Sequence, residues 1–156
     1  IKSIKKAARK GIEKELIRRV KSLWLSTSKQ IRVLCTGGEP LLQLDSDLIS
    51  AFKEEGFYIA IETNGTLPAP KGIDWICMSP KANTNIRLKS GNEIKVIHPQ
   101  ENYDPNDFMN FDFDDFYIQP MDSKSYSKNL KASLDFCMQN PRWSLSLQTH
   151  KILGIK

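Results

Sequence analysis

Short apolar segments alternate with longer amphipathic segments along most of this 156-residue chain, and this alternation constrains the fold more than any other feature. Helices are predicted over 45–55, where Asp45 or Ser46 can cap the N-terminus, and over 125–139, where the apolar stripe is Leu130, Leu134, Cys137 and Met138. Segments with the length and side-chain pattern of strands cover residues 31–35, 57–61, 75–78, 93–97, 116–119 and 143–148. Strands separated by helices indicate an α/β fold with a mostly parallel sheet and right-handed crossovers.

Polar clusters follow five of the predicted strands. Because ligands of such folds collect beyond the carboxyl ends of the strands, these clusters are expected to form one rim of a cleft. The clusters are Thr36-Gly37-Gly38-Glu39-Pro40, Glu62-Thr63-Asn64-Gly65-Thr66, Ser79-Pro80-Lys81, Gln119-Pro120-Met121-Asp122 and Gln148-Thr149-His150-Lys151.

The first two clusters carry the strongest signals of ligand binding. Gly37 and Gly38 let backbone amides approach a ligand closely, and Glu39 can accept a hydrogen bond from a ligand ammonium. The alternative is a plain strand-to-helix turn with a solvated Glu39. Glu62 and Asn64 can offer polar groups to a ribose or a carboxylate. The alternative there is an Asn-Gly hairpin turn, which fits poorly because the prolines that follow cannot pair in a central strand.

The other three clusters are more ambiguous. Ser79 and Lys81 place a hydroxyl and a cation at a strand end, although a single Lys is usually only solvated. Gln119 and Asp122 offer an amide and a carboxylate, or simply a turn that begins a helix. His150 follows the last predicted strand, where a single His is more often a structural hydrogen-bonding residue than a catalyst. No catalytic residue is assigned.

Charge is unevenly distributed along the chain. The net charge is +5, but residues 1–32 hold eleven Lys and Arg against two acids, so the remainder is acidic. A basic helix at the start could bind RNA phosphates. A packed helix with a solvated basic face is favoured, so nucleic acid is an improbable partner. Its apolar stripe would be Ile4, Ala8, Ile12, Leu16, Val20 and Leu23.

Other function classes find no support in the sequence. No apolar run approaches the ~18 residues that a membrane span needs, and no signal peptide is visible. Cys35, Cys77 and Cys137 are too far apart to form a metal-binding motif, so no metal ligand is assigned and a reducing cytoplasm is expected. The sequence has no P-loop, GxGxxG, HExxH or Ser-His-Asp signature.

Five motifs in order, from about Arg32 to Ile155, resemble the 7-carboxy-7-deazaguanine synthase family. These are radical S-adenosylmethionine enzymes of queuosine and deazapurine biosynthesis. The motifs are TGGEPLLQLD, ETNGTLPAP, GIDWICMSPKA, YIQPMD and NPRWSLSLQTHKILGI. The resemblance implies a partial (β/α) barrel whose first strand and cluster loop are missing, with the active site at the strand ends.

The resemblance also implies a reaction and its participants. The reaction is the ring contraction of 6-carboxy-5,6,7,8-tetrahydropterin to 7-carboxy-7-deazaguanine, with loss of ammonia. It uses S-adenosylmethionine, a [4Fe–4S] cluster and Mg²⁺, together with a reductant such as flavodoxin. A homodimer is also expected.

Roles for individual residues follow from the same resemblance. The residues at the methionine end of S-adenosylmethionine are Gly37, Gly38 and Glu39. Two further segments that bind this cofactor are Ser79, Pro80, Lys81 and Gln119, Pro120, Met121, Asp122, while Glu62 and Asn64 line its site. Thr36 and His150 are expected to contact the pterin substrate.

The chain departs from the family pattern where the cluster is bound. It lacks the three closely spaced cysteines and the adjacent Thr that would hold [4Fe–4S] and Mg²⁺, and Lys156 stands where the family has a substrate-contacting proline. Two explanations remain open. The chain, which begins with Ile1, is a fragment of a longer enzyme, or it is a short homologue that acts as a cluster-free nucleoside- or S-adenosylmethionine-binding module. The fragment is favoured, and these residues alone are expected not to turn over substrate. One domain is expected over 1–156, with a basic helix and linker over 1–30 and the barrel body over 31–156.

Overall fold

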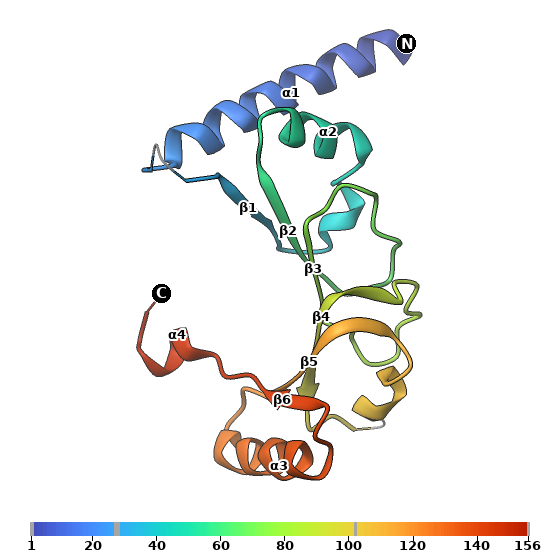
Figure 1. Ribbon diagram of the computed structural model, residues 1–156, viewed down its shortest axis with the longest axis vertical. Coiled ribbons are helices and arrows are strands. Elements are labelled where there is room, and N and C mark those ends of the chain that lie inside the picture. Colours follow the sequence, from blue (N-terminus) through green and yellow to red (C-terminus); the bar gives the residue numbers. More distant parts are fainter. Residues whose placement is uncertain (1, 27–28, 102, 156) are drawn as a thin grey trace. The chain divides into compact units, whose positions relative to one another are not determined.

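The computed structural model describes residues 2–26, 29–101 and 103–155, with only the backbone described for residues 2–10 (Figure 1). The chain separates into two compact units, one formed by residues 1–61 and 69–75 and the other by 62–68 and 76–156. The six described strands follow the order β1-β2-β3-β4-β5-β6, and every registered pair is parallel. The α/β class with a parallel sheet is therefore confirmed, and the strand order is that of an open sheet rather than a closed barrel.

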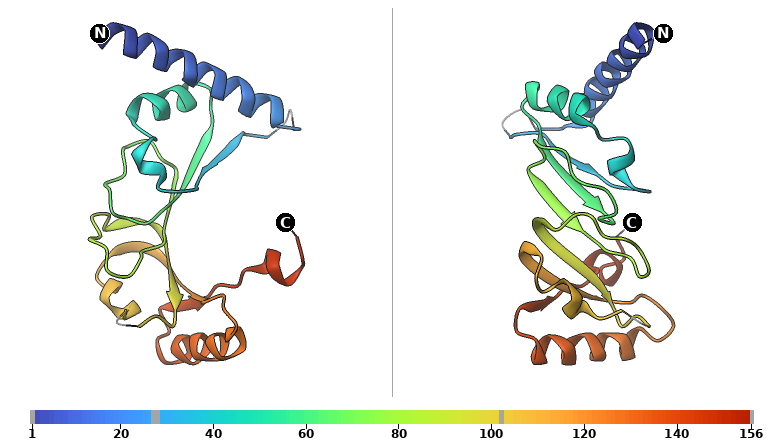
Figure 2. Two further views of the ribbon diagram at one scale, coloured as in Figure 1. Left: turned by 180° about the vertical axis from the view of Figure 1, so that it is seen from behind. Right: turned by 90° about the vertical axis from the view of Figure 1, so that its right-hand side faces the viewer.

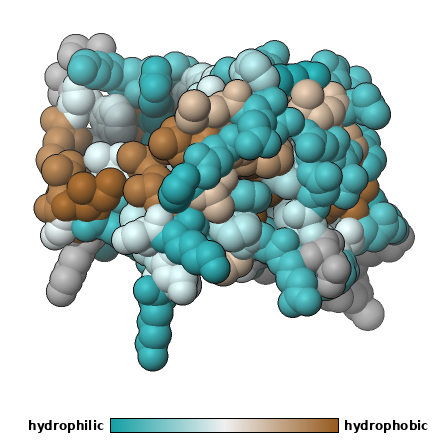
Figure 3. Space-filling model, turned by 90° about the horizontal axis from the view of Figure 1, so that it is seen from below, coloured by the Kyte–Doolittle hydropathy of each residue, from teal (hydrophilic) through white to brown (hydrophobic). Residues whose placement is uncertain are grey.

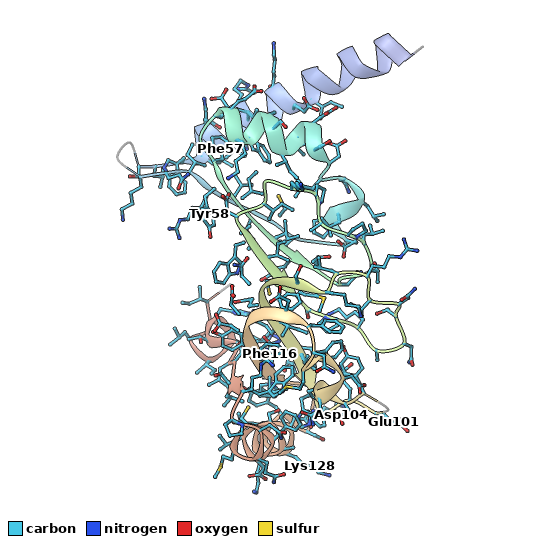
Figure 4. All side chains as sticks on the ribbon, turned by 45° about the vertical axis from the view of Figure 1, so that its right-hand side comes forward. Phe57, Tyr58, Glu101, Asp104, Phe116 and Lys128 are labelled. Atoms are coloured by element: carbon cyan, nitrogen blue, oxygen red, sulfur yellow. The ribbon has the colours of Figure 1, made fainter. Side chains whose placement is uncertain are left out.

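The first unit packs two helices with a parallel pair of strands. Its elements are α1 (Lys2–Leu23), β1 (Arg32–Cys35), the 3-10 helix η1 (Pro40–Leu42), α2 (Ser46–Glu54) and most of β2 (Tyr58–Thr63). As predicted, Asp45 caps α2, its Oδ1 accepting from the Leu48 N–H at 3.1 Å. The buried face of α2 carries Ile49 and Phe52, and the Phe52 ring stacks on the ring of Phe57, with the ring centroids 5.6 Å apart. Phe57 is labelled in Figure 4.

Helix α1 does not bury the whole of its predicted apolar stripe. Ile17 is buried, whereas Ile12 and Leu23 are 69% and 64% exposed. The predicted stripe was therefore wrong in part, because the face that packs in this unit is centred on Ile17 and Val20. The stripe residues Ile4 and Ala8, and the basic side chains of residues 2–10, lie outside the described side chains.

The second unit contains most of the sheet and one long helix. Its elements are β3 (Trp75–Met78, from Ile76), β4 (Ser90–His98), η2 (Pro105–Phe108), β5 (Asp112–Pro120), α3 (Tyr126–Gln139), β6 (Trp143–Leu145) and α4 (Thr149–Ile152). Figure 2 shows α3 lying alongside β5 and β6 from behind and from the side. The core of this unit contains Ile94, Val96 and Ile118, and the ring of Phe116 meets that of Trp143 edge-on, with the ring centroids 5.2 Å apart.

The apolar stripe predicted for helix α3 is only partly packed in this unit, with Leu130 and Cys137 half-buried. Leu134 and Met138, members of the predicted stripe, are 45% and 75% exposed. The buried positions include Asn129, whose amide donates to the Met121 carbonyl at 2.8 Å, and Ser133, whose hydroxyl donates to the His98 carbonyl at 3.2 Å. Polar side chains occupy this buried face because they donate hydrogen bonds to carbonyl groups at the ends of β4 and β5.

The last strand is shorter than predicted. It ends at Leu145, and the Ser146 N–H still donates to the Ile118 carbonyl at 2.8 Å. The chain then turns into α4, so His150 lies on a short helix rather than at the end of a strand.

Several apolar side chains of this unit are exposed, including Ile152, Leu153 and Ile155. Figure 3 shows hydrophobic side chains gathered at one side of a face that is otherwise mostly hydrophilic. None of the described helices is both long and apolar enough to cross a membrane.

Candidate functional site

A polar cavity of about 400 Å³ lies in the second unit, at the carboxyl ends of its strands. Five residues that the sequence predicts for the ligand site line this one cavity: Glu62, Ser79, Lys81, Gln119 and His150. They come from the end of β2, the loop after β3, the end of β5 and helix α4. The structure thus brings together side chains that are up to 88 positions apart in the sequence.

The backbone ladder explains why these residues converge. In the parallel sheet Ile97 of β4 pairs with Gln119 of β5, and both line the cavity. Beyond the end of β3, the Ser79 N–H donates to the Thr63 carbonyl at 2.7 Å, which fixes Ser79 next to the end of β2. Parallel strands that end at the same level place their following residues at one edge.

Many polar side chains of this cavity have no partner within the described part of the chain. The side chains of Ser79, Gln119, Ser146 and Gln148 make no hydrogen bond to other described residues, and Lys81 and His150 form no ion pair there. Hydroxyls, amides and an ammonium that converge without protein partners are what a polar ligand requires. The remaining lining residues are Cys77, Lys95, Ile97 and Leu147.

Lys95 is the cavity residue that the sequence analysis missed. It lies in the middle of β4, where Ile94 and Val96 face the core and Lys95 faces the other side. Its Nζ lies 3.2 Å from Glu93 Oε1, and the two side chains are only 25% and 18% exposed. A charged side chain between two core residues of a strand was the available signal, since such a residue faces away from the core, toward solvent, a partner or a ligand.

Electrostatics in the cavity keep Lys95 charged and Cys77 neutral. Burial acts to lower the pKa of Lys95, but the nearby carboxylates of Glu93 and Glu62 help to raise it above its ordinary value. Burial, together with a hydrogen bond to Glu93, raises the pKa of the Cys77 thiol well above its ordinary value. Cys77 therefore stays a thiol at neutral pH, which is neither a nucleophile nor a metal ligand.

The other predicted residues of this unit lie close to the cavity lining. Pro80 and Pro120 are buried, and the Met121 N–H donates to the His98 carbonyl at 2.8 Å. The carboxylate of Asp122 forms an ion pair with Lys151 of α4. This pair ties the segment after β5 to the helix that carries His150.

Asn64 holds the loop that follows β2. Its Oδ1 accepts from the Thr66 N–H at 2.9 Å and from the Thr66 hydroxyl at 2.7 Å, which closes an Asx-type turn. Gly65 has a φ of +77° and accepts at its carbonyl from the N–H groups of Arg87 and Leu88 at 2.8 and 3.0 Å. The turn interpretation of this motif is therefore present in the structure alongside Glu62, which lines the cavity.

Four predicted residues lie in the first unit, around a separate cavity of about 350 Å³: Thr36, Gly37, Gly38 and Glu39. Gly37 has a φ of +89°, a conformation that favours glycine. Glu39 caps η1, its Oε1 accepting from the Leu41 N–H at 3.0 Å. The rest of this lining is largely apolar, with Val33, Leu44 and Phe52 among it.

No cluster of side chains suited to a metal ion occurs in the part of the chain that the structure describes. Within it, no three His, Cys, Asp or Glu side chains are grouped so as to hold one. Burial raises the pKa of the Cys35 thiol, and burial also raises the pKa of the Cys137 thiol on α3. The residues present therefore do not fit a [4Fe–4S] cluster, which needs thiolates grouped around one centre.

Sequence comparison finds close relatives with one shared name. The 7-carboxy-7-deazaguanine synthase of Burkholderia multivorans is 48% identical over 140 residues, which are 90% of this chain and 67% of the relative. The synthase of Caulobacter vibrioides is 46% identical, over 90% of this chain and 67% of the relative. That of Bradyrhizobium diazoefficiens is 44% identical, over 91% of this chain and 68% of the relative. No protein-family model matches the chain.

Proposed function

Because the chain belongs to the 7-carboxy-7-deazaguanine synthase family, we propose that its polar cavity binds S-adenosylmethionine for the synthase reaction. The chain corresponds to about two thirds of the length of these relatives. The proposed reaction is the ring contraction of 6-carboxy-5,6,7,8-tetrahydropterin to 7-carboxy-7-deazaguanine. S-adenosylmethionine would supply the radical that begins it, and the protein would supply position and shelter from water.

One observation carries the proposal. The two segments assigned to the cofactor by resemblance, 79–81 and 119–122, are separated by 37 residues of chain, yet Ser79, Lys81 and Gln119 line one cavity. A chance similarity of short motifs would not require them to converge. Their side chains offer a hydroxyl, an ammonium and an amide, which suit the ribose, carboxylate and adenine edges of a nucleoside attached to an amino acid.

Glu62 and His150 complete the proposed lining. Glu62 is the acidic side chain of the cavity, and it suits the positive groups of the cofactor, which carries an ammonium and a sulfonium. His150 lies on α4, which the Lys151–Asp122 pair fastens near the end of β5. This placement agrees with the expectation that His150 meets the pterin.

The assignments for the first unit rest on resemblance. Gly37, Gly38 and Glu39 at the methionine end and Thr36 at the substrate stay predictions. So do the flavodoxin-type reductant, the homodimer and a cytoplasmic location.

We further propose that these 156 residues do not turn over substrate on their own, because the described residues offer no ligand set for the cluster. The chain reconstituted with iron and sulfide should lack cluster absorbance and should leave S-adenosylmethionine intact under reducing conditions. Cluster absorbance together with cleavage of S-adenosylmethionine would contradict this part of the proposal.

Titration calorimetry with S-adenosylmethionine tests the cavity assignment. Lys81→Met and Gln119→Leu should weaken binding, the first by about 10- to 100-fold because a charge-assisted hydrogen bond contributes roughly 1.5–3 kcal/mol. Lys131→Met and Gln139→Leu are matched controls, since both residues lie on α3 and outside the cavity. Equal effects of site and control variants, or no binding by the wild type, would overturn the assignment.

A further inference from the structure

Lys95 forms an ion pair with Glu93 and also lines the polar cavity, where its ammonium can contact a ligand. Its one ion pair among the described residues is the contact with Glu93, at 3.2 Å. An ammonium has three N–H donors, so at least one more remains to be used. Lys95 lines the cavity whereas Glu93 does not, so a ligand in the cavity can meet the ammonium without displacing Glu93 from the lining.

Burial makes this ammonium a stronger anion site than Lys81. The Lys95 side chain is 25% exposed, while Lys81 is an exposed residue at the rim. A charge pair formed away from water is screened less than one at the surface, so the same contact stabilises a bound anion more at Lys95. The ordinary structural role, a closed Lys–Glu pair, does not explain why the cation lines the same cavity as Ser79, Gln119 and Gln148, whose side chains make no hydrogen bond to other described residues.

The charge balance of the cavity indicates the kind of ligand. Glu93 neutralises part of the Lys95 charge and limits its movement, and Glu62 adds a second negative charge to the wall. A purely anionic ligand would meet Glu62 unfavourably. A ligand with a carboxylate and a positive or N–H-rich region can place the first on Lys95 and the second near Glu62.

We infer that Lys95 binds a carboxylate of the ligand in this cavity and that Glu93 positions its ammonium for that contact. The inference rests on the proposed function, in which two ligands carry a carboxylate: S-adenosylmethionine, on its methionine part, and the carboxylated tetrahydropterin. Because neighbouring carboxylates raise the pKa of Lys95, its charge is constant from pH 6 to pH 9, and its contribution to binding is independent of pH in that range.

The test compares each acid with its carboxylate-free analogue. Calorimetry measures the affinity of wild type and Lys95→Met for S-adenosylmethionine and decarboxylated S-adenosylmethionine, and for 6-carboxytetrahydropterin and tetrahydropterin. Lys95→Met should weaken the binding of one of the two acids by 10- to 100-fold and leave the affinity for its carboxylate-free analogue unchanged. The acid whose binding responds is the one whose carboxylate contacts Lys95. Lys95→Arg should retain most of the affinity. An equal loss of affinity for an acid and its analogue, or no loss of affinity for either acid, overturns the inference.

Two further variants guard against a trivial loss of structure. Lys95→Met leaves the half-buried Glu93 without its cation, so the double variant Glu93→Gln/Lys95→Met removes both charges and should show the same discrimination. Lys131→Met removes an exposed ion pair, Lys131–Asp135 at 2.9 Å, and should change no affinity. Loss of discrimination in the double variant counts against the inference.

A separate probe distinguishes failure of the inference from failure of the proposed function. If wild type binds neither S-adenosylmethionine nor the pterin, the proposed function is wrong. The inference is then decided by sodium benzoate, followed through the ¹⁵N resonance of the Lys95 ammonium, which Lys95→Arg assigns. A saturable shift that is absent at Lys131 supports a carboxylate site, and no shift overturns it.

Discussion

The glycine that follows Asn64 allows a quantitative test of how the loop beside the cavity is built. Gly65 is fully enclosed, and a Cβ added to it would lie 2.4 Å from Met78 Sδ and 2.9 Å from Met78 Cγ. Met78 is 0% exposed, so its side chain can move away from an added Cβ only by repacking against the core around it. The φ of Gly65, +77°, is also a backbone conformation that residues other than glycine adopt with difficulty.

Gly65→Ala should therefore destabilise the protein by two separable effects. The left-handed backbone costs about 1–2 kcal/mol for a residue with a Cβ. Overpacking a closed site costs about 1–3 kcal/mol more. Gly56→Ala is the matched control, because Gly56 has a φ of +74° and nothing within 4 Å of an added Cβ. The two variants share the backbone term and the change in the unfolded chain, so their difference of about 1–3 kcal/mol measures the Met78 clash alone.

Urea unfolding at 25 °C, followed by circular dichroism, provides the measurement. The free energy of unfolding should fall most in Gly65→Ala, less in Gly56→Ala, and the m-values should stay equal to that of wild type. Equal losses in the two variants would refute the packing around Gly65. A neutral Gly65→Ala would refute its backbone conformation as well.

Three further predictions concern stability in other parts of the chain. Asp74→Asn should lose about 1–2 kcal/mol at pH 7, because Asp74 accepts from Lys53 at 2.5 Å and from the Ile59 N–H at 2.7 Å. Burial acts to raise the pKa of Asp74, but these bonds lower it below 3.8, so the advantage of wild type in pH-dependent urea unfolding should be full above that pH and shrink below it. Gly11→Ala, at an exposed position of α1 with nothing within 4 Å, should raise the melting temperature through about 1 kcal/mol of helix propensity. Ser133→Ala should lose about 1 kcal/mol in urea through its bond to His98, whereas the exposed Ser127→Ala should not. An unchanged pH profile in the first, a lower melting temperature in the second, or equal effects in the third would contradict them.

The parts of the fold that local chemistry determines could be predicted from the sequence. The strand Trp75–Met78 was predicted at the residues where it lies, and the cap of α2 is Asp45, one of the two residues predicted for it. An apolar run between turn residues and a carboxylate at a helix start are local signals. The expected convergence of polar strand ends held for four of the five clusters, which line one cavity because parallel strands that end together place their loops at one edge. The first cluster, Thr36 to Glu39, lines a cavity of the first unit instead.

The errors arose where packing between elements decides the outcome. The buried face of α3 carries Asn129 and Ser133 because carbonyl groups of neighbouring segments need donors, which hydrophobic periodicity does not register. Lys95 was overlooked because a strand pattern gives its two faces but not which of them meets a cavity. Strand β6 is short because its pairing with β5 ends at Leu145. The alternation of Trp143, Leu145 and Leu147 in the sequence does not indicate where that pairing stops.

Hydrogen exchange with and without S-adenosylmethionine tests the central claim, that the cavity of the second unit is the cofactor site, most directly. Backbone amides in 79–81 and 119–122 should exchange more slowly when the cofactor is present, and Lys81→Met should reduce this protection while Lys131→Met leaves it intact. Protection of α3 alone, or unchanged exchange in both segments at saturating S-adenosylmethionine, would contradict the account.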